Sequence, residues 1–252
     1  MHFQSGLRRF TSVAVVAAMI SVQASASVEN VAAGSYADLL SLFTEWRAFE
    51  QPPDREGAPD YTAATIAQRH DELKSYQQRL AALNPGSWPV EQQVDYQIVR
   101  AEMNGMDFNI RVLQPWARDP AFYTTVWTEQ SDTPAHEGPT HHHLAELWTY
   151  EYPLSPAAEA RLASELSIVP PLLEQARLNL TGNARDLWVT GTGSMQHQVE
   201  ALDTLSEKTS GSGKDLRQAI HSAREATADF VGWLEQQASS KDGPSGIGKD
   251  NY

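Results

Sequence analysis

Cysteine is absent from this sequence of 252 residues. Its absence excludes disulfide-stabilised scaffolds, thiol catalysis, zinc–thiolate sites and iron–sulfur clusters, because each of these needs cysteine sulfur. It also excludes the attachment of a lipid to an N-terminal cysteine. These exclusions narrow the chemistry without naming a function.

Basic residues are too few to balance the acidic ones. The chain has 19 Lys and Arg residues against 32 Asp and Glu residues, which gives a formal net charge of −13. Nucleic acid is therefore not expected as a partner, because there is no basic excess to replace the counterions of phosphate groups. Hydrophobic residues make up 41% of the chain, which is enough for a sizeable core and too much for a wholly disordered protein.

Long apolar runs are also scarce, and the clearest one lies near the N-terminus. Arg8 and Arg9 precede the apolar residues 10–22, a run shorter than the ~20 residues that span a bilayer. Small residues at 24–26 follow, and this order is typical of a secretory signal peptide over residues 1–26, cleaved after Ala26. A retained membrane anchor is the alternative. We expect the helical domain, residues 27–252, to be exported to a bacterial periplasm or secreted, without a membrane association.

The mature chain shows a helical period of 3.6 residues and no alternating run long enough for a sheet. Ser35 is placed to cap the first helix, the second begins at about Thr62, and paired prolines interrupt a later helix at 170–171. The third helix is expected to carry its apolar side chains on Val90, Val94, Ile98 and Ala101. The expected helices are 36–49, 62–83, 90–113, 156–181 with a break, 192–208 and 213–239, with Gly182 as a C-terminal stop. The sequence therefore predicts an all-α fold, an irregular array of mixed-length helices.

Residues 114–154 interrupt this pattern with a long loop region rich in proline, aromatic residues and histidine. Asp119 and Pro120 are typical of the N-cap and first position of a short helix. The neighbouring Arg118 and Tyr123 could line a pocket, but a capped helix start with a buried Arg–Asp pair explains the segment more simply. The glycines at 191, 193, 246 and 248 match no phosphate-binding pattern and are interpreted as turns and caps.

The histidine-rich run at 136–143 is the candidate metal site. His136, His141 and His142 are weak candidate ligands, because imidazole suits Zn²⁺ or Cu²⁺. The five-residue spacing from His136 to His141 and the intervening Gly-Pro do not fit the helical zinc motif, although His142 and Glu146 stand four apart on a possible helix. Adventitious binding is therefore expected, and no residue is assigned as a metal ligand.

Several stretches together resemble the N-terminal part of a large bacterial family of exported proteins that carry a numbered domain of unknown function and look like zinc metallopeptidases. The likeness covers roughly residues 36–252. It rests on Leu83-Asn84-Pro85-Gly86-Ser87-Trp88-Pro89, Asp95-Tyr96, Arg100-Ala101-Glu102-Met103-Asn104, Trp116-Ala117-Arg118-Asp119-Pro120-Ala121-Phe122-Tyr123, Ala176-Arg177-Leu178-Asn179-Leu180 and Gly246-Ile247-Gly248-Lys249-Asp250-Asn251-Tyr252.

The resemblance implies a zinc cofactor for the full-length proteins, held by a His-Glu-x-x-Pro-Gly-His-His motif downstream of the Gly-x-Gly-Lys-x-x-Tyr segment. This sequence ends at that segment, so no catalytic residue and no cofactor are assigned within it. Peptides are the implied substrates. The residues expected to line a substrate cleft are Arg118, Asp119, Tyr123, Lys249 and Tyr252.

The favoured hypothesis is the N-terminal helical portion of an exported zinc-peptidase-like protein, not catalytically complete as given. Two alternatives stay open: a non-catalytic periplasmic helical module that binds a partner, and a His-rich metal-binding protein. The first hypothesis adds an expectation, because a helix that lacks its packing partner leaves apolar residues exposed. The residues expected to be partly exposed are Leu216, Ile220, Phe230, Trp233 and Leu234. The oligomeric state stays open.

Overall fold

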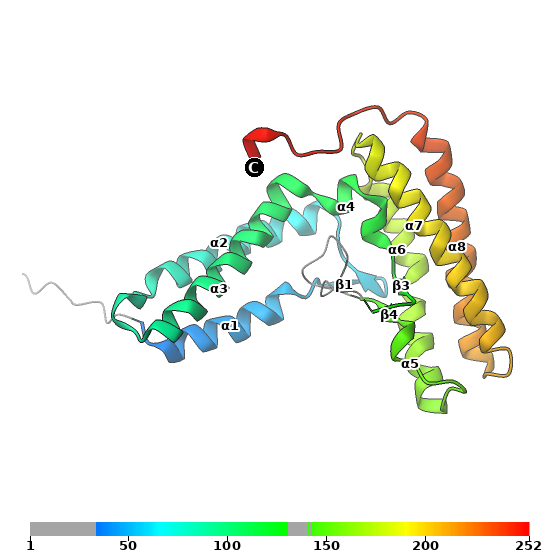
Figure 1. Cartoon of the computed structure of the whole chain (residues 1–252), viewed down its shortest axis with the longest axis horizontal. Coiled ribbons are helices and arrows are strands. Elements are labelled where there is room, and N and C mark those ends of the chain that lie inside the picture. The colour runs from blue at the N-terminus through cyan, green and yellow to red at the C-terminus, as the bar shows by residue number, and fades with distance from the viewer. Residues whose placement is uncertain (1–33, 131–140, 142, 252) are drawn as a thin grey trace, which may run out of the picture. The chain divides into compact units, whose positions relative to one another are not determined.

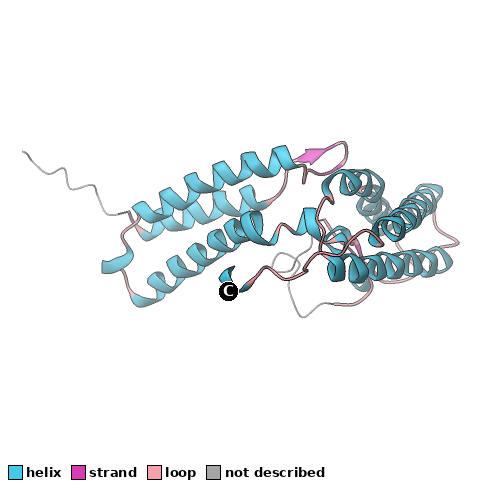
Figure 2. Ribbon diagram, turned by 90° about the horizontal axis from the view of Figure 1, so that it is seen from above, coloured by secondary structure: helices cyan, strands magenta, loops and turns pink. Residues whose placement is uncertain are grey.

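A computed structural model describes residues 34–130, 141 and 143–251, and it confirms the all-α prediction (Figure 1). The helices are α1 (Tyr36–Glu50), α2 (Ala63–Ala82), α3 (Val90–Phe108), α4 (Pro115–Arg118), α5 (Pro156–Ser167), α6 (Val169–Asn179), α7 (Arg185–Lys208) and α8 (Lys214–Ala238). Two short pairings accompany them: β1 (Asp54–Arg55) is antiparallel to β2 (Ala58–Pro59), and β3 (Val126–Trp127) is parallel to β4 (Ala145–Glu146) (Figure 2). Within the described residues, no helix is long and apolar enough to span a membrane.

Local capping sets the first two helix starts, and the cap by Ser35 was predicted. The Ser35 hydroxyl accepts a hydrogen bond from the Asp38 amide, and the Asp38 carboxylate accepts one from the Ser35 amide, so α1 begins with a reciprocal capping box. Thr62 caps α2 through the Thr65 amide. The two helices pack with α3 around a cluster that includes Leu39, Leu42, Trp46, Leu73 and Met103.

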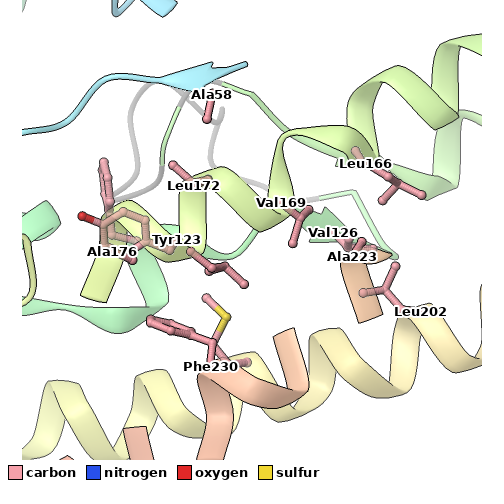
Figure 3. Close-up of a cluster of buried hydrophobic side chains, with 14 of the residues drawn as sticks. Ala58, Tyr123, Val126, Leu166, Val169, Leu172, Ala176, Leu202, Ala223 and Phe230 are labelled. Atoms are coloured by element: carbon pink, nitrogen blue, oxygen red, sulfur yellow. The ribbon is translucent and has the colours of Figure 1, made fainter. Parts of the chain in front are cut away.

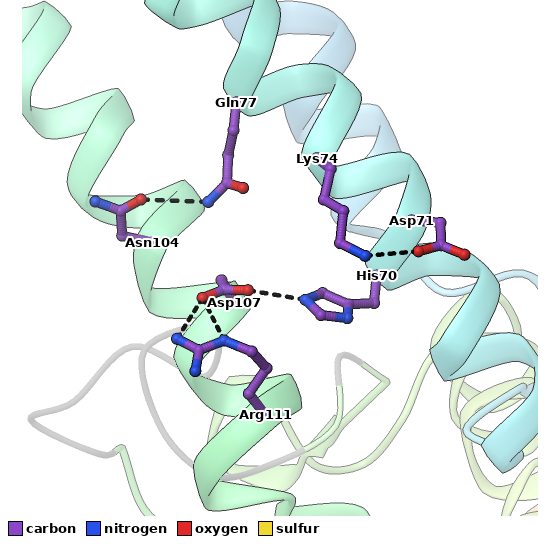
Figure 4. A network of polar contacts seen from close by, with 7 residues as sticks. All are labelled: His70, Asp71, Lys74, Gln77, Asn104, Asp107 and Arg111. Carbon is purple, nitrogen blue, oxygen red and sulfur yellow. Dashed lines mark hydrogen bonds and ion pairs between the residues drawn. The ribbon is translucent and has the colours of Figure 1, made fainter. Parts of the chain in front are cut away.

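Polar contacts join α2 to α3 on the surface of this cluster (Figure 4). Asp107 on α3 lies 2.8 Å from His70 Nε2 on α2 and accepts a hydrogen bond from Arg111 Nε at 2.8 Å. The hydrogen bond from Arg111, and then the one from His70, hold the pKa of Asp107 below its usual value. Gln77 on α2 also donates to Asn104 on α3 at 3.2 Å.

The apolar residues from which α3 was predicted do not face this core. Val90 is 74% exposed, and Val94 and Ile98 are each 51% exposed. The inward residues are instead Tyr96, Val99 and Met103, which lie on the opposite side of the helix. The helix therefore forms where it was predicted but is turned by about half a revolution, because two of its faces are apolar and the more aromatic one packs inward.

The second cluster lies between α5, α6, α7 and α8 (Figure 3). It corrects an expectation, because the apolar stripe of α8 is not exposed. Leu216 and Ile220 are 1% and 2% exposed, and Phe230 and Leu234 are fully enclosed. Trp233 is partly buried and stacks on Phe230 with ring centroids 5.5 Å apart. The long contact between α8 and α7, with further contacts from α5 and α6, supplies the cover that was expected to be missing.

Helix α7 begins at Arg185, seven residues earlier than predicted, so Gly191 and Gly193 lie inside a helix and the turn interpretation was wrong. Gly191 has a tertiary reason. A Cβ atom there would lie 2.7 Å from the Ala121 amide nitrogen and 2.8 Å from Pro120 Cβ, so only glycine lets the 3-10 turn Pro120–Tyr123 approach α7 this closely.

Helix α6 ends at Asn179, so Gly182 is not its C-terminal stop. The Gly182 amide instead donates to the Ala117 carbonyl at 2.8 Å. A Cβ atom at this position would lie 2.9 Å from the same oxygen. As at Gly191, a close approach between segments distant in sequence requires the glycine.

Candidate functional site

Arg118 holds the C-terminal tail rather than an acidic partner. Its guanidinium donates to the carbonyls of Leu113, Ser245 and Gly246 at 3.3, 2.9 and 3.4 Å. The hydrogen bonds of Arg118 are with backbone oxygens, and its charge also acts on the neighbouring Asp119 carboxylate. These contacts bring Arg118 close to the Gly-rich tail. The stretch around Arg118 and the tail are both among the segments on which the family resemblance rests.

Asp119 and Tyr123 are both structural in the described contacts. The Asp119 carboxylate caps the 3-10 turn by accepting from the Ala121 amide at 2.9 Å, as the sequence predicted. Burial raises the pKa of Asp119, against the opposing effects of this hydrogen bond and of Arg118. The Tyr123 ring is fully enclosed, its hydroxyl donates to the Trp116 carbonyl at 2.7 Å, and burial raises its pKa.

The remaining predicted residues lie in the tail. Lys249 is exposed in a short 3-10 turn, Lys249–Asn251, and Tyr252 lies outside the described residues. The structure thus brings Arg118 and the start of the tail together. The assignment of Arg118, Asp119, Tyr123, Lys249 and Tyr252 to a substrate cleft stays a prediction.

The histidine-rich run contains one histidine with a defined structural role. His141 is fully buried, and its Nδ1 accepts a hydrogen bond from the His143 amide at 3.2 Å. Its Nε2 lies 3.1 Å from Thr125 Oγ1, so both ring nitrogens have partners and the ring is a neutral tautomer that donates from Nε2. Glu146 belongs to β4, so the helical spacing expected for His142 and Glu146 does not form. His136 and His142 lie outside the described residues.

Zinc, which the resemblance implies for full-length proteins, finds no fitting ligand set in the described part of this chain. A zinc ligand needs an imidazole nitrogen with a lone pair available, and neither nitrogen of His141 offers one in this arrangement. Across residues 34–130, 141 and 143–251, no three His, Asp or Glu side chains converge on a point that could hold a metal.

A buried amide fixes the segment that carries β3. Gln198 on α7 accepts hydrogen bonds through Oε1 from the amides of Thr125 and Val126 at 2.6 and 3.0 Å. Its Nε2 donates to Thr227 on α8 at 3.1 Å. One side chain, 1% exposed, therefore joins three parts of the chain and holds residues 125–126 against α7.

Next to this anchor, a groove runs along the exposed face of α7. Its central part has a volume of about 540 Å³ and lies between α7 and the segment 147–152. A second hollow of about 280 Å³ shares Thr128, His197 and Ala201 with it, and a third of about 410 Å³ adjoins it at Tyr150. We refer to the first two hollows, which α7 lines, together as the α7 groove.

The wall of the α7 groove opposite the helix is aromatic. It is formed by Trp127, Trp148, Tyr150 and Tyr152. Trp148 is 41% exposed and Tyr152 38% exposed, which is unusual for side chains of this size. Polar side chains of α7, among them His197, Glu200 and Thr204, line the other wall. Such a mixture of apolar area and a few polar groups is typical of a ligand site.

Cations flank the aromatic wall. Lys208 Nζ lies 5.7 Å from the centroid of the Tyr152 ring, and the Arg161 guanidinium lies 4.2 Å from that of Tyr150. Arg161 Nε also donates to the Tyr150 hydroxyl at 2.8 Å, and that hydroxyl donates to Glu165 at 2.7 Å. Burial, followed by the hydrogen bond to Glu165, raises the pKa of Tyr150 to about 12, so this hydroxyl stays protonated at neutral pH.

Sequence reasoning missed the α7 groove. Its residues come from three stretches, 124–129, 147–152 and 194–208, and no short motif connects them. The one available signal was the concentration of tryptophan and tyrosine in residues 114–154. That signal could not show which aromatic rings would be exposed, because exposure depends on how the segment folds back onto α7.

Comparison with known proteins places the chain among bacterial proteins. The model of a family described as "Bacterial protein of unknown function (DUF885)" matches residues 46–252. Among solved structures, a putative lipoprotein of unknown function from Shewanella oneidensis is similar, with a TM-score of 0.58 and 17% sequence identity. The match covers 82% of this chain and 38% of that one, so the chain spans well under half the length of this structural neighbour. No curated protein matches the sequence.

Proposed function

This chain belongs to the DUF885 family of bacterial proteins of unknown function, and on that premise we propose that it supplies the N-terminal, peptide-holding part of an exported zinc-peptidase-like protein. The α7 groove is the observation that carries the proposal. The groove would form one wall of the substrate cleft. The water-activating zinc would be supplied by residues that the described part of this chain does not contain.

Peptide is the ligand that suits the shape and lining of the groove. From Ser194 to Lys208, α7 rises by about 21 Å, which matches about six residues of an extended chain. Aromatic rings on one wall can cover the apolar side chains of such a peptide, while hydroxyl and carboxylate groups on α7 can accept its backbone N–H groups.

The role of this chain's residues is to bind and orient. Gln198 holds the β3 segment in place, so Trp127 and Thr128 keep their positions at the groove without a ligand. Because these side chains are already ordered, peptide binding loses little free energy to their immobilisation. A zinc ion bound elsewhere would polarise the scissile carbonyl and activate water.

Isothermal titration of the 27–252 protein with unstructured hexapeptides tests the proposal. We expect measurable binding, with at least a fivefold loss of affinity in Trp148→Ala, because that exposed ring covers the peptide. Leu178→Ala is the matched control, since Leu178 is 79% exposed on α6 and does not line the groove. Equal affinities of the two variants, or an absence of peptide binding, would contradict the proposal.

The rival hypothesis of a non-catalytic binding module predicts the same peptide binding. It differs in that no related protein would hydrolyse the bound peptide. A related zinc peptidase of full length should hydrolyse the peptides that bind here, whereas a binding module has no such counterpart. Incubating the bound peptides with zinc and a longer family member that carries the His-Glu-x-x-Pro-Gly-His-His motif, with and without a chelator, separates the two hypotheses.

A further inference from the structure

The two ends of the α7 groove carry opposite charges. Glu129 lines the hollow that also contains Ser194, and Lys208 lines the other hollow, next to Tyr152. Both side chains are exposed, and within the described residues neither has an ion-pair partner. The cation beside Tyr150, Arg161, is already engaged by Glu165 at 3.6 Å.

From this polarity we infer that the α7 groove binds short peptides in one direction, with the C-terminal carboxylate at Lys208 and the N-terminal amine towards Glu129. The inference rests on the proposed function and specifies its substrate class as oligopeptides of about six residues with unblocked ends. A peptide of this length matches the rise of about 21 Å along α7 from Ser194, in one hollow, to Lys208, in the other.

Between Glu129 and Lys208, the described lining contains one further carboxylate, Glu200, which stands about 12 Å along α7 from Lys208. His197 and Glu200 face the groove from α7, and the opposite wall between the ends is formed by aromatic and hydroxyl side chains. The Lys208 ammonium is already placed against the Tyr152 ring, which limits its rotation and leaves its N–H groups available for a carboxylate. A peptide bound in the reverse direction would bring its amine to Lys208 and its carboxylate to Glu129, and both contacts would be repulsive.

One hexapeptide prepared in four forms tests the inference: unblocked, N-acetylated, C-amidated, and blocked at both ends. At low ionic strength we expect C-amidation to weaken binding to the unmodified protein by about three- to fivefold, a size suited to an exposed ion pair. In Lys208→Gln the amidated and unblocked peptides should bind alike. In Glu129→Gln the effect of acetylation should vanish while that of amidation remains.

Lys74→Gln on α2 is the control for net charge, and it should retain both end effects, because Lys74 pairs with Asp71 far from the groove lining. An amidation effect of equal size in Lys208→Gln and in the unmodified protein would overturn the inference. So would equal binding of all four peptides, although the proposed function would then survive. Failure of every form to bind would overturn both.

Discussion

At the scale of single residues, two buried amide side chains hold segments that are distant in sequence. Gln175 on α6 accepts from the Tyr61 amide at 2.6 Å and donates to the Pro59 carbonyl at 3.2 Å. Gln198 plays the same part for Thr125 and Val126. An amide offers a donor and an acceptor on one planar group, so it can complete the hydrogen bonding of a buried segment that has no neighbouring strand.

Replacing Gln198 with alanine should therefore be costly. The change leaves the amides of Thr125 and Val126 without their acceptor and opens a cavity, so we expect unfolding free energy to fall by about 2 to 4 kcal/mol. Gln196→Ala, on the same helix, is the control, because its exposed hydrogen bond to Glu235 should contribute less than ~0.5 kcal/mol. Urea unfolding followed by circular dichroism measures both. Similar losses in the two variants would show that the Gln198 contacts are not needed.

At the scale of helices, α3 combines a correct boundary with an incorrect face. Tyr96, Val99 and Met103 are enclosed, whereas Val90, Val94 and Ile98 form an exposed apolar stripe. Hydrophobic periodicity predicts that a helix has an apolar face. Where two faces are apolar, it does not predict which of them is buried. The inward side is selected by what α1 and α2 present to it, and that information is not local.

Two valines five residues apart on α3 test this orientation. Val99 is 5% exposed and Val94 51% exposed, so the same substitution removes the same atoms from opposite environments. We expect Val99→Ala to lower the unfolding free energy by about 2 kcal/mol and Val94→Ala to change it by less than ~0.5 kcal/mol. The measurement is chemical denaturation of both variants of the 27–252 protein. A larger loss for Val94 would mean that the stripe is covered in solution.

Helix starts that depend on neighbouring residues were predictable, and features that depend on distant ones were not. Ser35 caps the first helix as predicted. Thr62 and Ser155, expected only as helix starts, are also caps, and all three accept from the amide three residues on. Gly191 was interpreted as a turn because its reason, the approach of Pro120, lies some seventy residues away. The α7 groove could not be predicted from the sequence for the same reason, since Trp148 and Lys208 line one hollow only when the chain is folded.

At the scale of the whole molecule, the described residues form two hydrophobic clusters that share Ile66 and Trp116 at their margins. The first cluster is built from α1 to α3 and the second from the helices that carry the groove. The structural neighbour has the same fold over 82% of this chain and continues well beyond it. Among the described residues, the apolar stripe on α3 is exposed and the one on α8 is buried.

The last prediction concerns the N-terminal segment of the protein and its removal during export. Arg8 and Arg9, the apolar run at 10–22 and the small residues at 24–26 predict cleavage after Ala26. The removed segment holds two arginines and no acid, so the mature charge becomes −15, from −13 less the two positive charges. Intact mass spectrometry of protein recovered from the periplasm or medium should find Ser27 at the N-terminus. Ala24→Asp should block cleavage, because the site requires small residues. A recovered protein that still begins at Met1 would instead indicate a retained anchor.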